Sequence, residues 1–174
     1  MGQKLGFEIN VSPLAKSEIP TILEIENDSQ LEPWTETAFL EEIDKPHSRL
    51  LAARQCAGLS FAPGSSTRDI VGYICFWSVL GEIQILNIAV RKDLRRRGIA
   101  RKLIEAAVST GIEENAKSVT LEVRESNLAA RKLYESLGFI IVGERPNYYG
   151  VMKESAILMT LDIIDFEKRT TVGV

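Results

Sequence analysis

The most chemically suggestive stretch of the chain is a basic turn that follows a buried strand. Seven of the twelve residues in the segment 91–102 are lysine or arginine, and the apolar run 85–90 precedes them. Gly98 and Ala100 then open a segment in which apolar residues recur four apart, a spacing that predicts a helix. Unpaired N–H groups at such a strand-to-helix junction bind anions. We therefore predict a site for a phosphate-bearing ligand; a basic surface turn is the alternative.

Glu122 is the strongest candidate for acid–base chemistry. It lies in the segment 118–123, where apolar and polar residues alternate and so predict a strand with one buried face. Glu122 is expected to point away from that face. Either it forms an ion pair with Arg124 or Arg145, or it serves as a general base toward an amine, directly or through a water molecule.

Aromatic residues mark a second possible binding surface. Tyr148 and Tyr149 are adjacent in a segment that we expect to be a loop between two strands. Adjacent aromatic side chains in an exposed loop favour a role in binding. Trp34 lies just before a helix predicted over 36–43, and it either packs against that helix or lines a binding slot.

Four other residues invite a chemical interpretation. Asn87 marks either an irregularity in its strand that frees backbone groups or a buried amide bonded to its neighbours. His47 is the only histidine and matches no motif, so we assign it no role. Cys56 and Cys75 lie in apolar stretches and are interpreted as buried free thiols. No cluster has the spacing of a metal site.

Several short motifs resemble those of the GCN5-related N-acetyltransferases, the GNAT family. Arg95-x-x-Gly98-x-Ala100 resembles the family's Arg/Gln-x-x-Gly-x-Gly/Ala motif, which binds the pyrophosphate of acetyl-CoA. Further similar motifs are Asn87-Ile-Ala-Val90, Leu121-Glu-Val-Arg-x-Ser-Asn127, Leu133-Tyr-Glu-Ser-Leu-Gly-Phe139 and Asn147-Tyr-Tyr149. Together they resemble the RimI type, the ribosomal-protein alanine N-acetyltransferases, closely over 82–162 and weakly over 1–80.

The resemblance implies an enzyme that uses acetyl-CoA as cosubstrate and no metal. Glu122 would be the general base, and Tyr134 would be the general acid toward the CoA thiolate, although a tyrosine on the apolar stripe of a helix is more often a packing residue. A backbone N–H near Val90 would stabilise the developing oxyanion. The implied acetyl-CoA-binding residues are Ile88, Ala89, Val90, Arg96, Arg97, Gly98, Ile99, Ala100, Arg101 and Asn127, and the implied acceptor-binding residues are Trp34, Tyr148 and Tyr149.

The elements that must position these residues alternate between strands and helices along the chain. Their order, β-α-α-β-β-β-α-β-α-β-β, predicts an α/β domain with a mixed sheet and helices on both faces. The resemblance adds that the sheet is mostly antiparallel and that two parallel strands, 83–90 and 118–123, splay apart around acetyl-CoA. Predicted strands cover 7–11, 49–56, 70–80, 83–90, 118–123, 139–142 and 156–161, and predicted helices cover 18–26, 36–43, 98–115 and 128–137.

Length and composition bound the class of protein. The 174 residues are expected to form a single domain, with a core over about 7–164 and a frayed tail over 165–174. The segment 58–68 is rich in glycine, proline and serine and is expected to be a flexible hairpin tip. A net charge of −3 argues against a general nucleic-acid binder. The longest apolar run is too short to span a bilayer, so we expect a cytoplasmic protein. We also expect a monomer or a weak dimer.

The pKa of the acceptor amine favours a protein N-terminus over a lysine side chain as the acceptor. Deprotonating an α-amine at neutral pH costs about 1 kcal/mol, against about 5 kcal/mol for lysine, so a weak carboxylate base suits a protein N-terminus. The hypothesis is direct acetyl transfer in a ternary complex to a protein N-terminus, with the N-terminal alanine of ribosomal protein bS18 as the family's usual acceptor. The alternatives are an acetyltransferase for a polyamine, an aminoglycoside or protein lysines, and a CoA-binding module without turnover.

Overall fold

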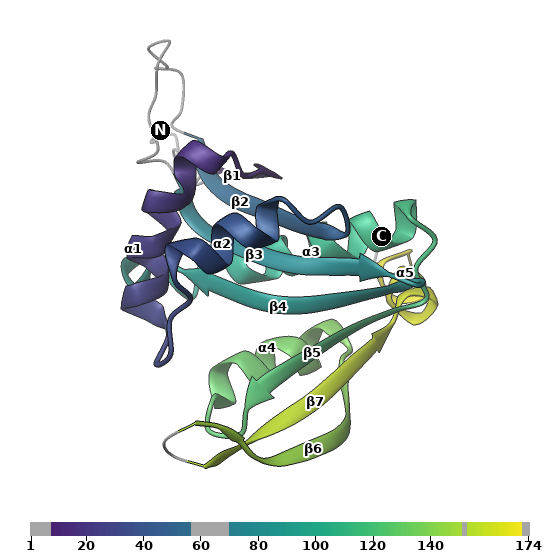
Figure 1. Ribbon diagram of the computed structural model, residues 1–174. Helices are drawn as coiled ribbons and strands as arrows, with labels where there is room; N and C mark the ends of the chain where they lie inside the picture. The colour runs from purple at the N-terminus through teal and green to yellow at the C-terminus, as the bar shows by residue number, and fades with distance from the viewer. Residues whose placement is uncertain (1–7, 57–69, 151–152, 172–174) are drawn as a thin grey trace, which may run out of the picture. The chain divides into compact units, whose positions relative to one another are not determined.

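The computed structural model describes residues 8–56, 70–150 and 153–171 (Figure 1). The seven described strands are hydrogen-bonded in the order β1-β2-β3-β4-β5-β7-β6, and the β4–β5 pair is parallel. The predicted mixed, mostly antiparallel α/β fold is confirmed. The elements are β1 (Glu8–Pro13), α1 (Ile19–Ser29), α2 (Glu36–Ile43), β2 (Ser48–Cys56), β3 (Ile70–Val79), β4 (Glu82–Val90), α3 (Ile99–Glu113), β5 (Ser118–Arg124), α4 (Leu128–Leu137), β6 (Ile140–Tyr149), β7 (Glu154–Asp162) and α5 (Ile163–Thr171).

The chain forms two compact units, which we describe separately. The first unit comprises Met1–Cys75 and Asn87–Ala106, and the second comprises Phe76–Leu86 and Ala107–Val174. Strands β3 and β4 and helix α3 contribute residues to both. The interpretation of the chain as a single domain stays a prediction.

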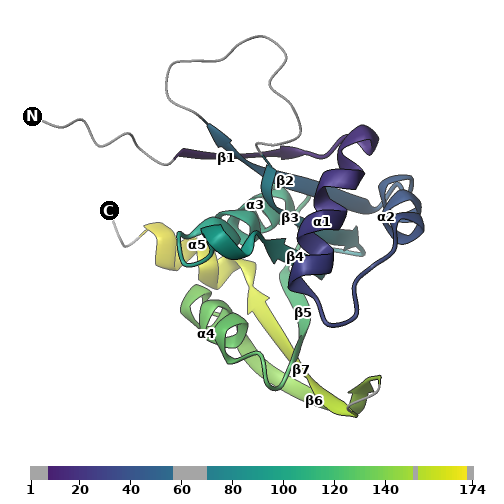
Figure 2. The ribbon, with the colours of Figure 1, turned by 90° about the vertical axis from the view of Figure 1, so that its left-hand side faces the viewer.

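The first unit carries helices on both faces of its strands. Helices α1 and α2 lie on one face, and the first part of α3 lies on the other (Figures 1 and 2). Thr35 caps the start of α2, because its hydroxyl accepts a hydrogen bond from Ala38 N–H at 3.2 Å. Fully buried side chains such as Ile22, Phe39 and Leu103 fill both interfaces and fix the helices on the strands.

The second unit packs α4 against β5, β7 and β6 (Figures 1 and 2). Asn127 caps α4, since its side-chain oxygen accepts a hydrogen bond from Ala130 N–H at 3.2 Å. Gly138 ends the helix with a φ of 100°, a left-handed conformation that glycine adopts without strain. The alternation predicted for β5 is confirmed: Val119, Leu121 and Val123 are buried, and the residues between them are half-exposed.

The parallel pairing of β4 with β5 is short. It begins at Glu82 opposite Ser118 and ends at Ile85 opposite Leu121, after four residue pairs. Strand β5 nevertheless continues to Arg124, where it pairs with β7 alone. The splay of these two strands that the resemblance implies stays a prediction.

Several boundaries differ from the prediction, three of them by more than two residues. The tail expected to be frayed from residue 165 is helix α5 as far as Thr171, because Asp162 caps its first turn at Asp165 N–H and the side chain of Ile163 is buried. Tyr148 and Tyr149 lie at the end of strand β6 and not in a loop. Helix α1 extends to Ser29. The predicted flexible segment 58–68 lies outside the described residues.

Candidate active site

The first unit contains the predicted anion-binding turn. Strand β4 ends at Val90, and α3 begins at Ile99 after a short 3-10 helix. Arg96 and Gly98 have φ values of 64° and 79°, and the first hydrogen bond of the α3 turn runs from Lys102 N–H to the Gly98 carbonyl. The first turn of a helix leaves its N–H groups without acceptors inside the helix. Together with the positive helix end they provide the donors that a pyrophosphate requires.

The backbone at Gly98 has space beside it for a ligand to approach closely. A Cβ placed on Gly98 would meet no protein atom within 4 Å, so the backbone is open on that side. Arg96 and Arg97 are exposed beside it. Arg101 lies 3.8 Å from Glu105 in the next turn of α3. The residues predicted to bind the pyrophosphate thus lie together in one turn.

Arg95 has a structural contact in this turn. Its Nε donates to the Val90 carbonyl at 3.1 Å, and its Nη2 donates to Ser29 Oγ at 3.0 Å. The side chain therefore ties the turn to the end of β4 and to the end of α1. These two hydrogen bonds give the arginine at the first position of the motif a role in holding the turn.

A buried carboxylate in the first unit was not predicted as a functional residue. Glu26 is 0% exposed and lies on α1. Its Oε1 accepts hydrogen bonds from Trp34 N–H at 2.8 Å and from Asn87 Nδ2 at 2.9 Å, and its Oε2 accepts one from the Tyr73 hydroxyl. Burial, followed by the nearby carboxylate, raises the pKa of Tyr73 far above its usual value, so this phenol stays a donor.

Gln30 extends the Glu26 network to the backbone of β4. Its Nε2 donates to Asn87 Oδ1 at 3.0 Å and to the Ile88 carbonyl at 3.3 Å. Asn87 is thus a buried amide bonded to its neighbours, which is one of the two predicted alternatives. The network connects Trp34 with the strand that holds Ile88, Ala89 and Val90. The only signal in the sequence was a carboxylate next to the apolar stripe of α1.

Trp34 packs against its own helix. Its ring lies 5.3 Å from that of Phe39, which in turn contacts Tyr73 edge to face at 5.4 Å. The packing interpretation is therefore supported for Trp34, and its role toward an acceptor stays a prediction.

The second unit places Glu122 among partners from β6. Arg145 Nη1 lies 2.9 Å from Glu122 Oε1, so the predicted alternative of an ion pair with Arg145 is observed. The same carboxylate is the main influence on Tyr148 and raises its pKa. Glu122 keeps 21% of its side chain exposed, so the carboxylate can be reached by a small polar group.

Tyr134 is buried on α4. It is 6% exposed, and its ring lies 5.6 Å from that of Phe139. Burial raises the pKa of Tyr134 above its usual value, with a smaller effect from Tyr149. The phenol therefore stays protonated, which suits a hydrogen-bond donor better than a group that must give up its proton.

Tyr149 has a cation over its ring. The Arg124 guanidinium lies 4.0 Å from the ring centroid, and the rings of Tyr148 and Tyr149 meet edge to face at 5.1 Å. Burial is the largest influence on Tyr149 and raises its pKa. The second unit thus brings Glu122 together with both tyrosines of the predicted acceptor surface.

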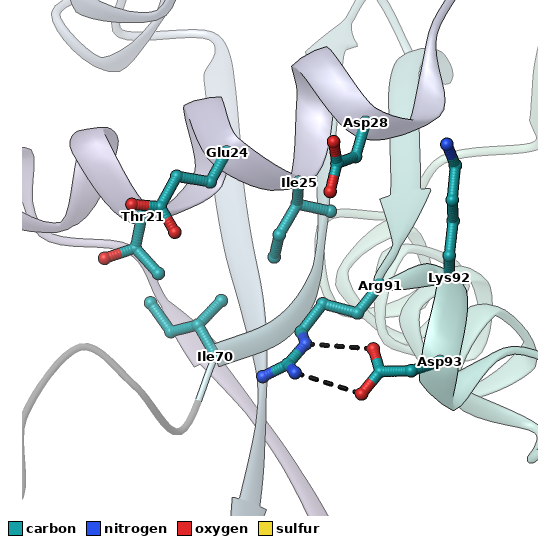
Figure 3. Close-up of a pocket in the computed structure, with 8 residues that line it drawn as sticks. All are labelled: Thr21, Glu24, Ile25, Asp28, Ile70, Arg91, Lys92 and Asp93. Carbon is teal, nitrogen blue, oxygen red and sulfur yellow. Dashed lines mark hydrogen bonds and ion pairs between the residues drawn. The ribbon is translucent and has the colours of Figure 1, made fainter.

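A cavity of about 690 Å³ lies in the first unit, away from the residues predicted above. Figure 3 shows Arg91 paired with Asp93 on one side of it, at 3.2 and 3.0 Å. None of the residues predicted to bind acetyl-CoA lines this cavity, so we do not assign acetyl-CoA to it. The lining residues are Thr21, Glu24, Ile25, Asp28, Ile70, Arg91, Lys92 and Asp93.

Other classes of site find little support in the part of the chain that is described. No three His, Cys, Asp or Glu side chains there come together as metal ligands would. None of the described helices has the length and apolar character of a membrane span. Cys75 is buried beside Ser48, and burial raises the pKa of its thiol to about 12, so it is unreactive. The side chain of Cys56 lies outside the described residues.

Comparison with known families identifies the same region of the chain. The sequence model of the Acetyltransferase (GNAT) family matches residues 19–139. This range includes the anion-binding turn, Glu122 and Tyr134.

Two related proteins and one more distant structure are similar over nearly the whole chain. The [ribosomal protein bS18]-alanine N-acetyltransferase of Salmonella typhimurium is 34% identical over 155 residues, 88% of this chain and 97% of the relative. The crystal structure of the ribosomal-protein-S18-alanine N-acetyltransferase from Escherichia coli has a TM-score of 0.76 at 30% identity and covers 90% of this chain and 94% of its own. Arabidopsis thaliana NAA60 in complex with acetyl-CoA has a TM-score of 0.78 at 20% identity, with 90% and 99% covered, which shows a shared fold.

Proposed function

Since the chain belongs to the GNAT family of acetyltransferases, we propose that it transfers the acetyl group of acetyl-CoA to the N-terminal α-amine of a protein. The acceptor we propose is the N-terminal alanine of ribosomal protein bS18, which is the acceptor named for the Salmonella and Escherichia coli relatives. A ribosomal acceptor places the reaction in the cytoplasm. The observation that carries the proposal is the half-buried Glu122 carboxylate, which is paired with Arg145 and raises the pKa of Tyr148.

The first unit supplies the groups that would hold acetyl-CoA. The N–H groups at the start of α3 and the exposed Arg96 and Arg97 match the charge of a pyrophosphate. The backbone of residues 88–90, braced by Gln30 at the Ile88 carbonyl, would present a donor to the developing oxyanion. The thioester of acetyl-CoA supplies the activated acetyl group.

Glu122 would take the proton that the acceptor amine must lose before it attacks. Freeing the lone pair of an α-amine at pH 7 costs about 1 kcal/mol, against about 5 kcal/mol for lysine. A carboxylate is a weak base, which is sufficient for the first amine and poorly suited to the second. This difference favours a protein N-terminus over a lysine side chain.

Tyr134 would stabilise the CoA thiolate as it leaves. The raised pKa of its buried phenol makes full proton transfer unfavourable, so we assign it a hydrogen bond to the sulfur. Tyr148 and Tyr149 would contact the first residues of the acceptor, and Asn127 would contact CoA while it caps α4.

A small polyamine is a weaker candidate acceptor. The cavity of the first unit carries Glu24, Asp28 and Asp93, which a polyamine could contact. Asp93 is paired with Arg91, and Lys92 lies on the same wall, so the lining is mixed and does not form an acidic pocket.

The deciding experiment measures acetyl transfer from labelled acetyl-CoA to a panel of peptides that differ at their first two residues. A lysine peptide with a blocked N-terminus and spermidine serve as controls. We expect transfer to peptides that begin with alanine, and a loss of about a hundredfold or more in kcat for Glu122→Gln. A preference for spermidine or for the blocked peptide would overturn the proposed acceptor.

A further inference from the structure

Glu154 occupies a position in the second unit that connects two parts of the proposed site. It is the first residue of β7, and its side chain is 17% exposed. Its Oε1 accepts a hydrogen bond from Ser126 N–H at 2.7 Å, and its Oε2 lies 3.4 Å from Arg124 Nη1. One carboxylate therefore contacts both the turn after β5 and a side chain at the end of β5.

The contact with Ser126 fixes the turn that leads into α4. Asn127 follows directly, and its N–H bonds to the Arg124 carbonyl at 3.0 Å. Glu125 N–H bonds to the Ser155 carbonyl at 3.1 Å, so two successive N–H groups of this turn are held by β7. The backbone position of Asn127 thus depends on the start of β7.

The contact with Arg124 reaches the aromatic surface. The side chain of Arg124 is also 17% exposed, and its guanidinium lies 4.0 Å from the centroid of the Tyr149 ring. Tyr149 is opposite Glu154 in the β6–β7 ladder, so its backbone is positioned by the same residue. Loss of the carboxylate would remove one of the groups that hold the guanidinium over the ring.

We propose that Glu154 is a positioning residue for acetyl transfer, which holds the turn before Asn127 directly and the ring of Tyr149 through Arg124. The inference rests on the proposed function, in which Asn127 contacts acetyl-CoA and Tyr149 contacts the acceptor. The Glu154 side chain would thus affect the binding of both acetyl-CoA and the acceptor. Glu154 itself touches neither of them in this assignment.

The test uses Glu154→Gln and Arg124→Gln in the full chain, with steady-state kinetics for acetyl-CoA and for a peptide that begins with alanine. We expect Glu154→Gln to raise the KM of both substrates by about five- to tenfold, the effect of replacing a charge-assisted hydrogen bond by a weaker neutral one. Arg124→Gln leaves the bond between Glu154 and Ser126 in place, so it should raise the KM of the peptide alone. Arg124→Lys keeps the charge and should recover part of the loss.

Asp165→Asn is the matched control. It converts a carboxylate to an amide in an exposed pair, in which Lys168 Nζ lies 3.5 Å from Asp165 Oδ1 on α5. Both KM values should be unchanged in this variant. A lower Tm for Glu154→Gln with unchanged KM values would show a purely structural role and overturn the inference.

Hydrogen exchange separates this inference from the proposed function. In Glu154→Gln the amides of peptides that span 124–130 should exchange faster than in the unmodified protein, whereas Arg124→Gln should leave them nearly unchanged. If the unmodified protein acetylates no amine, the proposed function fails while the exchange pattern still tests the link between Glu154 and the turn. Unchanged exchange in Glu154→Gln would overturn the link even in an active enzyme.

Discussion

Arg145 Nη1 lies 2.9 Å from Glu122 Oε1, so the carboxylate that we propose as the base already pairs with a cation from its own chain. The Arg145 side chain is 55% exposed and that of Glu122 is 21% exposed. Both side chains of the pair are therefore accessible to solvent. An acceptor amine that approaches Glu122 must displace this guanidinium or share the carboxylate with it.

Arg145→Gln should lower the KM of the acceptor peptide. Ion pairs of this exposure contribute about 0.2–1 kcal/mol, so the peptide should bind up to about fivefold more tightly once the competing cation is gone. The KM of acetyl-CoA should stay the same. Initial rates at varied peptide concentration measure the effect, and Arg145→Lys, which keeps the charge, is the control. A higher peptide KM would instead assign Arg145 to acceptor binding.

Tyr134→Phe should lower kcat at least about tenfold with little change in acetyl-CoA affinity, because it removes one hydrogen bond to the leaving sulfur. Burial raises the pKa of Tyr134, so the phenol stays protonated throughout the range in which an ordinary tyrosine would begin to ionise, near pH 10. Ionisation of Tyr134 should therefore cause no loss of kcat below about pH 10 in the unmodified protein. Tyr134→Phe should leave the alkaline part of the pH–rate profile unchanged in shape. A pH–rate profile of both proteins checks this, and equal turnover at neutral pH would exclude the role.

Glu26→Ala should destabilise the fold by about 3–5 kcal/mol, because two side-chain donors and the Trp34 N–H lose a buried acceptor together. Urea unfolding at neutral pH measures the loss. Glu24→Ala is the matched control, since Glu24 is an exposed carboxylate on the same helix, and its effect should stay within about 0.5 kcal/mol. Equal stability of the two variants would contradict the importance of the network.

Gly72→Ala should weaken acetyl-CoA binding. A Cβ at Gly72 would lie 2.8 Å from the Ala89 carbonyl oxygen and 3.2 Å from Val90 Cγ2, so the β4 backbone must shift. We expect a raised KM for acetyl-CoA and a stability loss of about 1–3 kcal/mol. In Gly143→Ala the new Cβ would meet only Leu158 atoms at 4.0 Å, and this control should behave like the unmodified protein.

Local sequence signals predicted the elements well where a single physical rule decides them. Alternation in β5 placed Glu122 on the half-exposed face, and Asn127 and Gly138 marked the ends of α4. The helix over 163–171 had comparable signals, an aspartate cap followed by apolar residues and a basic last turn, but the dense charge made it resemble a tail. Tyr148 and Tyr149 were expected in a loop because Pro146 and Asn147 precede them, yet the strand resumes after an irregularity.

The partners of the charged side chains could not be predicted in the same way. Glu122 had two arginines within reach, and only the pairing of β6 with β7 beside β5 selects Arg145. The donors of Glu26 lie 47 and 61 positions away in the sequence at Tyr73 and Asn87. Such contacts depend on strand order and register, which no local pattern contains.

The shared carboxylate of Glu26 also limits how the sequence can diverge. A chain that loses Glu26 alone keeps a phenol and an amide without an acceptor, and a chain that loses only Tyr73 or Asn87 leaves the anion underbonded. Stepwise replacement therefore passes through unstable intermediates. We expect homologous sequences to retain glutamate, tyrosine and asparagine at these three positions as a set or to exchange them as a set, so that the positions covary.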